Sequence, residues 1–191
     1  MKTFESERIY LKKIEPHYLD DNFMSWFRDE ELMQYYTNSK KVITKEVLLK
    51  SIEDGEKNGN NFTYGIFFKE NDQCIGTIKI GPINLVHKIS DLVVLIGDKN
   101  YHGKGLAVEA IRLGNQLAFE KHDIRKLFGG MYASNIASIK AYTNAGWVIE
   151  GKLHGHYLVN NKAEDRILVG CFNPAYFTQE EIENARYTNI R

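Results

Sequence analysis

The first sign of chemistry in this 191-residue sequence is a glycine-bearing segment at residues 97–109. It reads Gly-Asp-Lys-Asn-Tyr-His-Gly-Lys-Gly-Leu-Ala-Val-Glu, after an apolar run and before a helical pattern. Glycines at positions 103 and 105 let the backbone approach a ligand closely with its N–H groups turned outward. The start of the following helix adds unpaired N–H groups and a partial positive charge. We therefore predict a pyrophosphate site here, with Lys104 adding charge.

Two common phosphate-binding motifs do not fit this segment. A dinucleotide fingerprint needs a third glycine where Val108 stands. A Walker loop needs Ser or Thr after the lysine, and Gly105 follows Lys104. The alternative without a ligand is a plain glycine-bearing turn.

A second pattern lies downstream of the loop. It places Asn135, Ser138 and Tyr142 at regular intervals before Gly146-Trp147. Together with the loop segment 102–107, this spacing resembles the paired motifs of the GNAT superfamily of N-acetyltransferases. In that superfamily the loop begins with Gln or Arg, where this sequence has His102. The resemblance is close over residues 89–147 and looser elsewhere.

The resemblance implies a fold and a cofactor. The fold is mixed α/β, with a mostly antiparallel central sheet, splayed central strands and flanking helices, as one domain over residues 1–191. The cofactor is acetyl-CoA, with CoA as product, lying in the opening between strands 91–96 and 127–132. A main-chain N–H at the end of the first of these strands would polarise the thioester carbonyl. The residues expected to hold the cofactor are Leu95, Ile96, Gly97, His102, Gly103, Lys104, Gly105, Leu106, Ala107, Val108 and Asn135.

The same resemblance assigns catalytic roles for direct attack of a primary amine on the thioester. Tyr142 would protonate the departing thiolate; the structural alternative is an aromatic side chain on the core face of a helix. Some relatives carry a glutamate base on the strand before Asn135, but this sequence has Gly129-Gly130 there. Asp91, acting through water, is the leading candidate base. The reserve candidates are Glu109 and His87.

The acceptor site is expected between the N-terminal helices and the last hairpin, at Trp26, Tyr36, His154 and His156. Two histidines without a third ligand make a weak metal site, so no metal is expected. The overall pattern resembles ribosomal-protein N-terminal acetyltransferases and enzymes that acetylate nucleotide-linked amino sugars, and it favours the amino sugar or another small amine. A CoA-binding module without catalysis and a nucleotide-binding protein of another fold are the alternatives.

The elements that must position these residues follow from periodicity and capping signals. Apolar alternation predicts a strand at residues 9–11 and a strand pair at 62–68 and 74–80. The central strand, loop and helix are followed by a strand at 127–132 and a short helix at 137–145. A hairpin then turns at Asn160-Asn161. Thr44 and the pair Thr178 with Glu181 are predicted helix caps.

Composition limits the remaining functions. Lys plus Arg and Asp plus Glu both number 25, so the net charge offers no general attraction to nucleic acid or an anionic membrane. The spacing of Cys74 and Cys171 matches neither a metal-binding motif nor a disulfide framework, so we expect both to be buried free thiols. We see neither a secretory signal nor a membrane-spanning run, and we expect a cytoplasmic protein with a small-molecule amine substrate. The candidate assembly is a homodimer.

Overall fold

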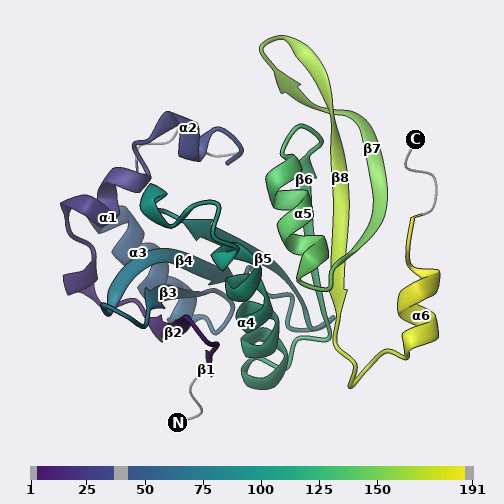
Figure 1. Cartoon of the computed structure of the whole chain (residues 1–191). Helices are drawn as coiled ribbons and strands as arrows, with labels where there is room; N and C mark the ends of the chain where they lie inside the picture. Colours follow the sequence, from purple (N-terminus) through teal and green to yellow (C-terminus); the bar gives the residue numbers. More distant parts are fainter. Residues whose placement is uncertain (1–3, 37–42, 188–191) are drawn as a thin grey trace.

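An eight-stranded sheet organises the computed structural model, which describes residues 4–36 and 43–187. The strand order is β1-β2-β3-β4-β5-β6-β8-β7, and every described neighbouring pair is antiparallel except β5 with β6. This confirms the predicted mixed α/β fold (Figure 1). The strands are β1 (Phe4–Glu5), β2 (Ile9–Lys13), β3 (Phe62–Phe68), β4 (Gln73–Ile80), β5 (Ile89–Ile96), β6 (Lys126–Tyr132), β7 (Val148–Val159) and β8 (Lys162–Phe172).

Helices cover both faces of this sheet, with α1 to α3 on one face and α4 on the other (Figure 1). The helices are η1 (Pro16–Tyr18), α1 (Asp21–Trp26), α2 (Glu30–Met33), α3 (Lys45–Lys57), η2 (Lys99–Tyr101), α4 (Leu106–Lys121), α5 (Ile136–Asn144) and α6 (Gln179–Asn184). No helix in the described ranges has the length and apolar character needed to cross a membrane.

Local signals in the sequence explain where several helices begin. The Thr44 hydroxyl accepts a hydrogen bond from the Val47 N–H at the start of α3. Thr178 and Glu181 form the predicted capping box at the start of α6. Both caps satisfy N–H groups that a helix leaves unpaired in its first turn. The strand β1 was not predicted, because a two-residue edge strand carries no periodic signal.

The sheet opens between β5 and β6, as predicted. The two strands pair only from Ile89 with Lys126 to Asp91 with Phe128. Beyond that point β5 stays paired with β4 up to Ile96, while β6 follows β8 up to Tyr132. The two halves therefore diverge, and beyond this point one edge of each central strand has no partner strand among the described residues (Figure 1).

Candidate active site

The glycine loop presents a row of unpaired amides at the start of α4. Gly103 and Gly105 adopt left-handed φ angles of +71° and +76°, a conformation that glycine adopts without strain. Within the described part of the chain, the main-chain N–H groups of residues 103–107 donate to no protein group. Five such donors beside a helix N-terminus form an anion-binding surface.

The free edge of β5 continues this surface. The Leu92 carbonyl accepts a hydrogen bond from the Tyr142 hydroxyl at 2.8 Å, and the Ile96 carbonyl lies 2.8 Å from His102 Nε2. Both partners are on the side away from β4. Main-chain polar groups alternate sides along a strand, so Val94, midway between these two residues, turns its N–H and C=O into the opening.

This alternation corrects part of the sequence prediction. The Leu95 main chain faces β4, where it pairs with Thr77. The Gly97 N–H donates to the Ile75 carbonyl at 2.9 Å. Neither residue can offer its N–H to a ligand in the opening, and Val94, which the motifs do not mark, takes that position.

We call the cavity beside the glycine loop the loop pocket; its volume is about 510 Å³. It runs from the start of α4 along β5 to α2 and α5. Of the residues predicted to hold a cofactor, the lining includes Leu95, Ile96, His102, Gly103, Gly105, Leu106, Ala107 and Asn135. The Asn135 side chain also caps α5 by accepting from the Ser138 N–H at 3.2 Å.

Three predicted cofactor residues do not line the loop pocket: Gly97, Lys104 and Val108. The Lys104 ammonium lies 5.5 Å from the Tyr101 ring centroid. The Val108 N–H donates to the Gly105 carbonyl at 3.1 Å and is therefore used inside the loop. The row of available amides ends at Ala107.

Arg8 supports the loop from outside and was not predicted. Its Nη1 donates to the Lys104 carbonyl at 3.0 Å, and its other nitrogens bond to the Glu109 carboxylate. Burial alone would raise the pKa of Glu109, but the hydrogen bonds from Arg8 and Ser6 hold it below its ordinary value. Glu109 does not line the loop pocket, and its contacts with Arg8 and Ser6 make it a structural anchor rather than a base.

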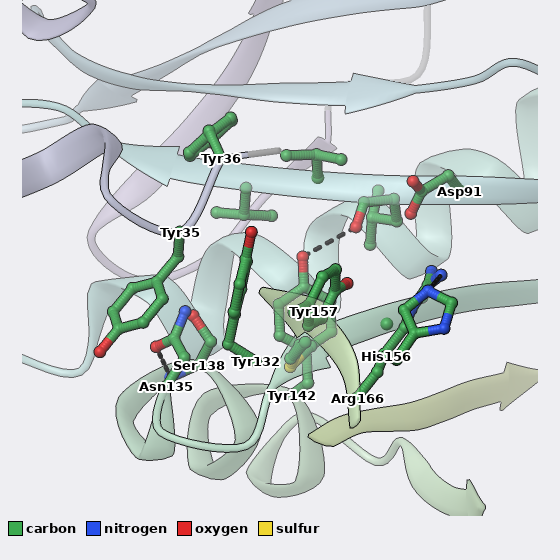
Figure 2. A pocket seen from close by; sticks show the side chains of 16 residues that line it. Tyr35, Tyr36, Asp91, Tyr132, Asn135, Ser138, Tyr142, His156, Tyr157 and Arg166 are labelled. Carbon is green, nitrogen blue, oxygen red and sulfur yellow. Dashed lines mark hydrogen bonds between the residues drawn. The ribbon is translucent and has the colours of Figure 1, made fainter. Parts of the chain in front are cut away.

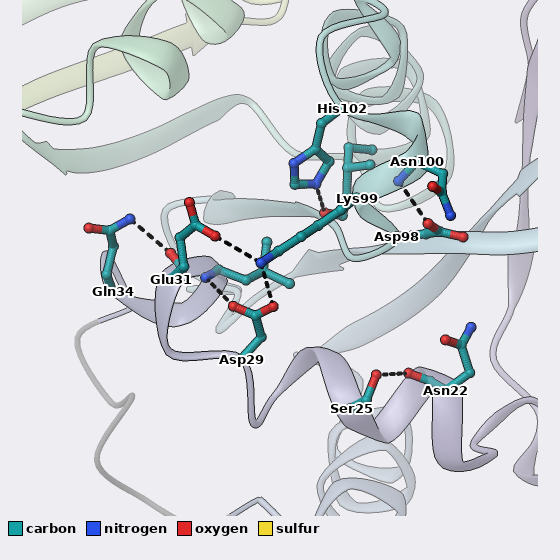
Figure 3. A network of polar contacts seen from close by, with 11 residues as sticks. Asn22, Ser25, Asp29, Glu31, Gln34, Asp98, Lys99, Asn100 and His102 are labelled. Carbon is teal, nitrogen blue, oxygen red and sulfur yellow. Dashed lines mark hydrogen bonds and ion pairs between the residues drawn. The ribbon is translucent and has the colours of Figure 1, made fainter.

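A polar network ties α2 to the loop region. Lys99 Nζ lies 2.7 Å from Asp29 Oδ2 and 2.8 Å from Glu31 Oε2 (Figure 3). Asp29 also caps α2 by accepting from the Leu32 N–H. The network fixes α2 against the wall of the loop pocket, whose lining includes both Glu31 and Lys99.

A second cavity, of about 400 Å³, adjoins the first, and we call it the tyrosine pocket. Figure 2 shows the tyrosines across its middle, with Asp91, His156 and Arg166 together at one end. The two pockets share Tyr35, Tyr36, Val94, Asn135 and Ser138 in their linings. A molecule in one pocket can therefore contact a molecule in the other.

Tyr142 is both a core residue and a pocket residue. Its ring packs edge-on against Trp147 with centroids 4.8 Å apart, while its hydroxyl reaches the Leu92 carbonyl. Burial raises the pKa of Tyr142 above its ordinary value, and the charge of Asp91 adds to the effect. The phenol therefore keeps its proton at physiological pH, as a general acid must before it acts.

Asp91 lies in the tyrosine pocket where β5 and β6 part. Burial raises the pKa of its carboxyl, opposed by a backbone hydrogen bond from Leu92 and by the charges of Lys79 and Arg166. A raised pKa makes a carboxylate a better proton acceptor. His87, the other reserve base, lines neither the loop pocket nor the tyrosine pocket.

Two predicted acceptor residues are not in the tyrosine pocket. Trp26 is 4% exposed and packs against Gly97, where an added Cβ would lie 2.0 Å from the indole. The side chain of His154 is 78% exposed and lies 3.5 Å from Asp165. The strand β7 loses its register between Leu153 and Tyr157, so His154 and His156 do not share a face of a regular strand as predicted. Tyr36 and His156 do line the pocket.

Two lining residues, Tyr132 and Arg166, have no signal in the sequence that would place them here; they are cross-strand partners on β6 and β8. Tyr35 and Tyr157 also line the pocket, and they lie in the two regions where the acceptor site was expected. The tyrosine rings contact one another. The rings of Tyr132 and Tyr157 are stacked with their centroids 3.9 Å apart, and the centroid of the Tyr35 ring lies 5.6 Å from that of Tyr132. Within the described ranges, no group of three or more His, Cys, Asp or Glu side chains is arranged to hold a metal ion.

Known proteins resemble this chain in sequence and fold. The family model described as acetyltransferase (GNAT) domain matches residues 8–148. The chain is 27% identical over 113 residues to the probable N-acetyltransferase YjcK of Bacillus subtilis, covering 59% of this chain and 62% of that protein. It is 26% identical over 106 residues to spermidine N(1)-acetyltransferase of Escherichia coli K12, covering 56% of each. The matched segments thus span less than two thirds of these relatives.

Solved structures show the same fold at lower identity. Spermidine N-acetyltransferase from Vibrio cholerae, solved with CoA and spermine, has a TM-score of 0.78 at 17% identity, over 91% of this chain and 100% of that one. Ribosomal-protein-S5-alanine acetyltransferase from Vibrio fischeri has a TM-score of 0.76 at 20% identity, over 93% and 100% of the two chains. The family model covers most of the chain, and the protein belongs to the GNAT acetyltransferase domain family.

Proposed function

We propose that this protein is an acetyl-CoA-dependent N-acetyltransferase that acts on a primary amine. The observation that carries the proposal is that two main-chain surfaces border one cavity. The free amides of Gly103, Gly105, Leu106 and Ala107 and the edge of β5 that lacks a partner strand both line the loop pocket. A diphosphate linked to an extended, amide-rich arm matches this combination.

The residues present fit this cofactor. The amides of residues 103–107 would hold the diphosphate, and Val94 would pair with the arm as a neighbouring strand would. Asn135 lies where the two pockets meet and can contact the arm beyond its capping bond. When bound, acetyl-CoA supplies an acetyl group activated as a thioester.

Three groups near that junction would carry the proton and charge changes. The Val94 N–H points into the opening and would stabilise negative charge on the carbonyl oxygen. Asp91 would take the proton that the amine loses, directly or through water. The Tyr142 hydroxyl would give its proton to the departing sulfur, exchanging its bond to the Leu92 carbonyl for that partner.

The acceptor is proposed as a primary amine in the tyrosine pocket. The amino-sugar acceptor favoured by the sequence finds no support among the similar proteins named above; where their names give a substrate, it is spermidine or a ribosomal protein. A protein N-terminus is the second candidate acceptor, because one structural neighbour acts on a ribosomal protein. A CoA-binding module without catalysis is the remaining alternative.

Thiol release from acetyl-CoA in the presence of single amines tests the proposal. The panel comprises amino acids, amino sugars, polyamines and peptide N-termini, with product mass as the readout. We expect amine-dependent release of CoA, and an acetyl-CoA-induced rise in melting temperature that ATP and NAD do not produce. A rise with acetyl-CoA and no acetylated product would favour the binding module. No rise at all would contradict the cofactor assignment.

A further inference from the structure

The charges that line the tyrosine pocket identify a class of acceptor. Among the sixteen described lining residues, Asp91 is the sole acidic side chain, while Arg166 and His156 are basic. A polycationic acceptor such as a polyamine needs several carboxylates to replace its lost hydration. This pocket offers one carboxylate and a fixed guanidinium, which would repel a second ammonium group.

A glycine on the neighbouring strand leaves the space that the Arg166 side chain occupies. Tyr132 is the cross-strand partner of Arg166, and Gly130 lies two residues away on the same strand. A Cβ added at Gly130 would lie 1.9 Å from Arg166 Nε. The missing side chain therefore makes room for the guanidinium to lie against β6 (Figure 2).

The guanidinium is partly buried and lacks an anionic partner. Its Nε is buried and has no hydrogen-bond acceptor among the described residues. Its Nη1 lies 3.3 Å from His156 Nε2, and no carboxylate of the described chain forms an ion pair with it. Asp91 interacts with this charge electrostatically but forms no ion pair with it. A guanidinium taken out of water without an ion pair costs free energy, so the site favours a ligand that brings an anion to it.

The tyrosines set the direction of this positive group. The Arg166 guanidinium lies 5.9 Å from the Tyr157 ring centroid, and Tyr157 stacks on Tyr132. The stack and Gly130 confine the guanidinium to the end of the pocket that also holds Asp91 (Figure 2). An acceptor that reaches this end meets a fixed positive charge beside an aromatic wall.

We infer that the acceptor amine also carries an anionic group, a carboxylate or a phosphoryl group, which Arg166 binds. This inference rests on the proposed acetyltransferase function and narrows its substrate class. The acceptor is therefore not a polyamine, although spermidine N-acetyltransferases share the fold. The aromatic wall favours an acceptor with a flat or apolar body between its two ends.

Matched pairs of amines test the inference in the full-length protein. Tyrosine is compared with tyramine, glucosamine 6-phosphate with glucosamine, and spermidine serves as the polycationic arm. We expect a higher kcat/KM for the acidic member of one pair, by roughly tenfold or more, from a charge-assisted hydrogen bond. The pair that shows the preference distinguishes a carboxylate from a phosphoryl ligand.

Variants of β8 assign the preference to its source. Arg166→Gln should abolish the difference within the pair, and Arg166→Lys should retain part of it. Lys162→Gln removes an exposed positive charge from the same strand and should leave the ratio unchanged. An equal loss for both members of the pair in Arg166→Gln would overturn the inference, as would spermidine as the best substrate.

A binding readout separates this inference from the proposed function. Melting temperatures are measured with CoA present and each member of a pair added in turn. If no amine is acetylated but the acidic member stabilises the wild type and not Arg166→Gln, anion recognition stands and the catalytic proposal fails. If acidic members neither bind nor react better than their neutral partners, the inference is wrong.

Discussion

The two pockets are built in different ways. In the loop pocket, the groups proposed to hold the cofactor belong to the main chain, from the amides at the start of α4 to the edge of β5. The tyrosine pocket presents side chains from α2 to the end of β8, with Tyr132, Tyr157 and Arg166 in contact across strands. Main-chain N–H and C=O groups are nearly the same in every residue. The loop pocket therefore tolerates substitutions that leave the main-chain conformation unchanged. The tyrosine pocket changes its chemistry with each substitution.

The largest expected effect tests whether Trp26 belongs to the support of the loop pocket or to the acceptor site. Trp26→Ala should lower the free energy of unfolding by about 3–5 kcal/mol, because it leaves a cavity under Gly97. Chemical denaturation measures this loss. The KM for the amine in the folded fraction should stay unchanged; a raised amine KM with normal stability would return Trp26 to the acceptor site.

The next test concerns Asp91 in the tyrosine pocket. Asp91→Asn should lower kcat/KM by roughly a hundredfold, as expected for loss of a general base. In the wild type, kcat/KM should rise with pH through a pKa above the ordinary value of 3.8, because burial raises the pKa of Asp91. Glu109→Gln is the control and should keep that acidic limb. If the acidic limb of the kcat/KM profile persists in Asp91→Asn, another residue is the general base.

The same carboxyl links stability to pH. A raised folded-state pKa means that, as pH rises above 3.8, the unfolded chain loses this proton before the folded chain does. Asp91 therefore destabilises the fold increasingly as pH rises through its folded-state pKa. Asp91→Asn should be more stable than the wild type above that window and equal to it below pH 3.8. A constant stability difference at all pH values would contradict the shift.

A smaller effect is expected at Tyr142, which borders the tyrosine pocket from α5. Tyr142→Phe should lower kcat by roughly tenfold or more while the acetyl-CoA affinity stays nearly constant. Tyr64→Phe is the matched control, since it removes another largely buried hydroxyl with one partner, His122, outside both pockets. Equal turnover in the two variants would leave Tyr142 as a core residue only.

The smallest effect is expected from the loop backbone itself. Gly105→Ala introduces a Cβ at a left-handed φ of +76° with no contact closer than 3.7 Å, so strain in the backbone is its main cost. A cost of about 1 kcal/mol would reduce acetyl-CoA affinity by about fivefold, measured by calorimetry. Gly59→Ala imposes similar strain at +66° beyond the end of α3 and should leave that affinity unchanged. Equal acetyl-CoA affinities in the two variants would argue against the glycine loop as the binding site for the diphosphate.

The sequence predicted the loop pocket better than the tyrosine pocket for a physical reason. Glycines, a following helix and a cap are local features, and they placed residues 103–107 correctly at the start of α4. The outward turn of Val94 depends on its pairing with β4, which the sequence does not specify residue by residue. The prediction chose Leu95 and Gly97 instead and was wrong about their N–H groups.

The acceptor residues depend on contacts between distant segments. Arg166 enters the tyrosine pocket because its partner strand carries Gly130, a diagonal relation fixed by the register of β6 and β8. His154 was misplaced because the irregularity between Leu153 and Tyr157 shifts the alternation of β7. Trp26 was misplaced because a large aromatic residue in a helix suits a core and a pocket equally well by composition.

Amide chemical shifts test the central claim most directly. In the ¹⁵N-labelled protein, CoA is added and the shift of each backbone N–H is followed. We predict that the largest changes occur at residues 103–107 and at Val94, whose N–H faces the opening beside the Tyr142 hydroxyl. Little change is expected at Gly97 and Val108, whose N–H groups donate to main-chain carbonyls. Saturable binding with its largest shifts elsewhere, and none at residues 103–107, would contradict the account.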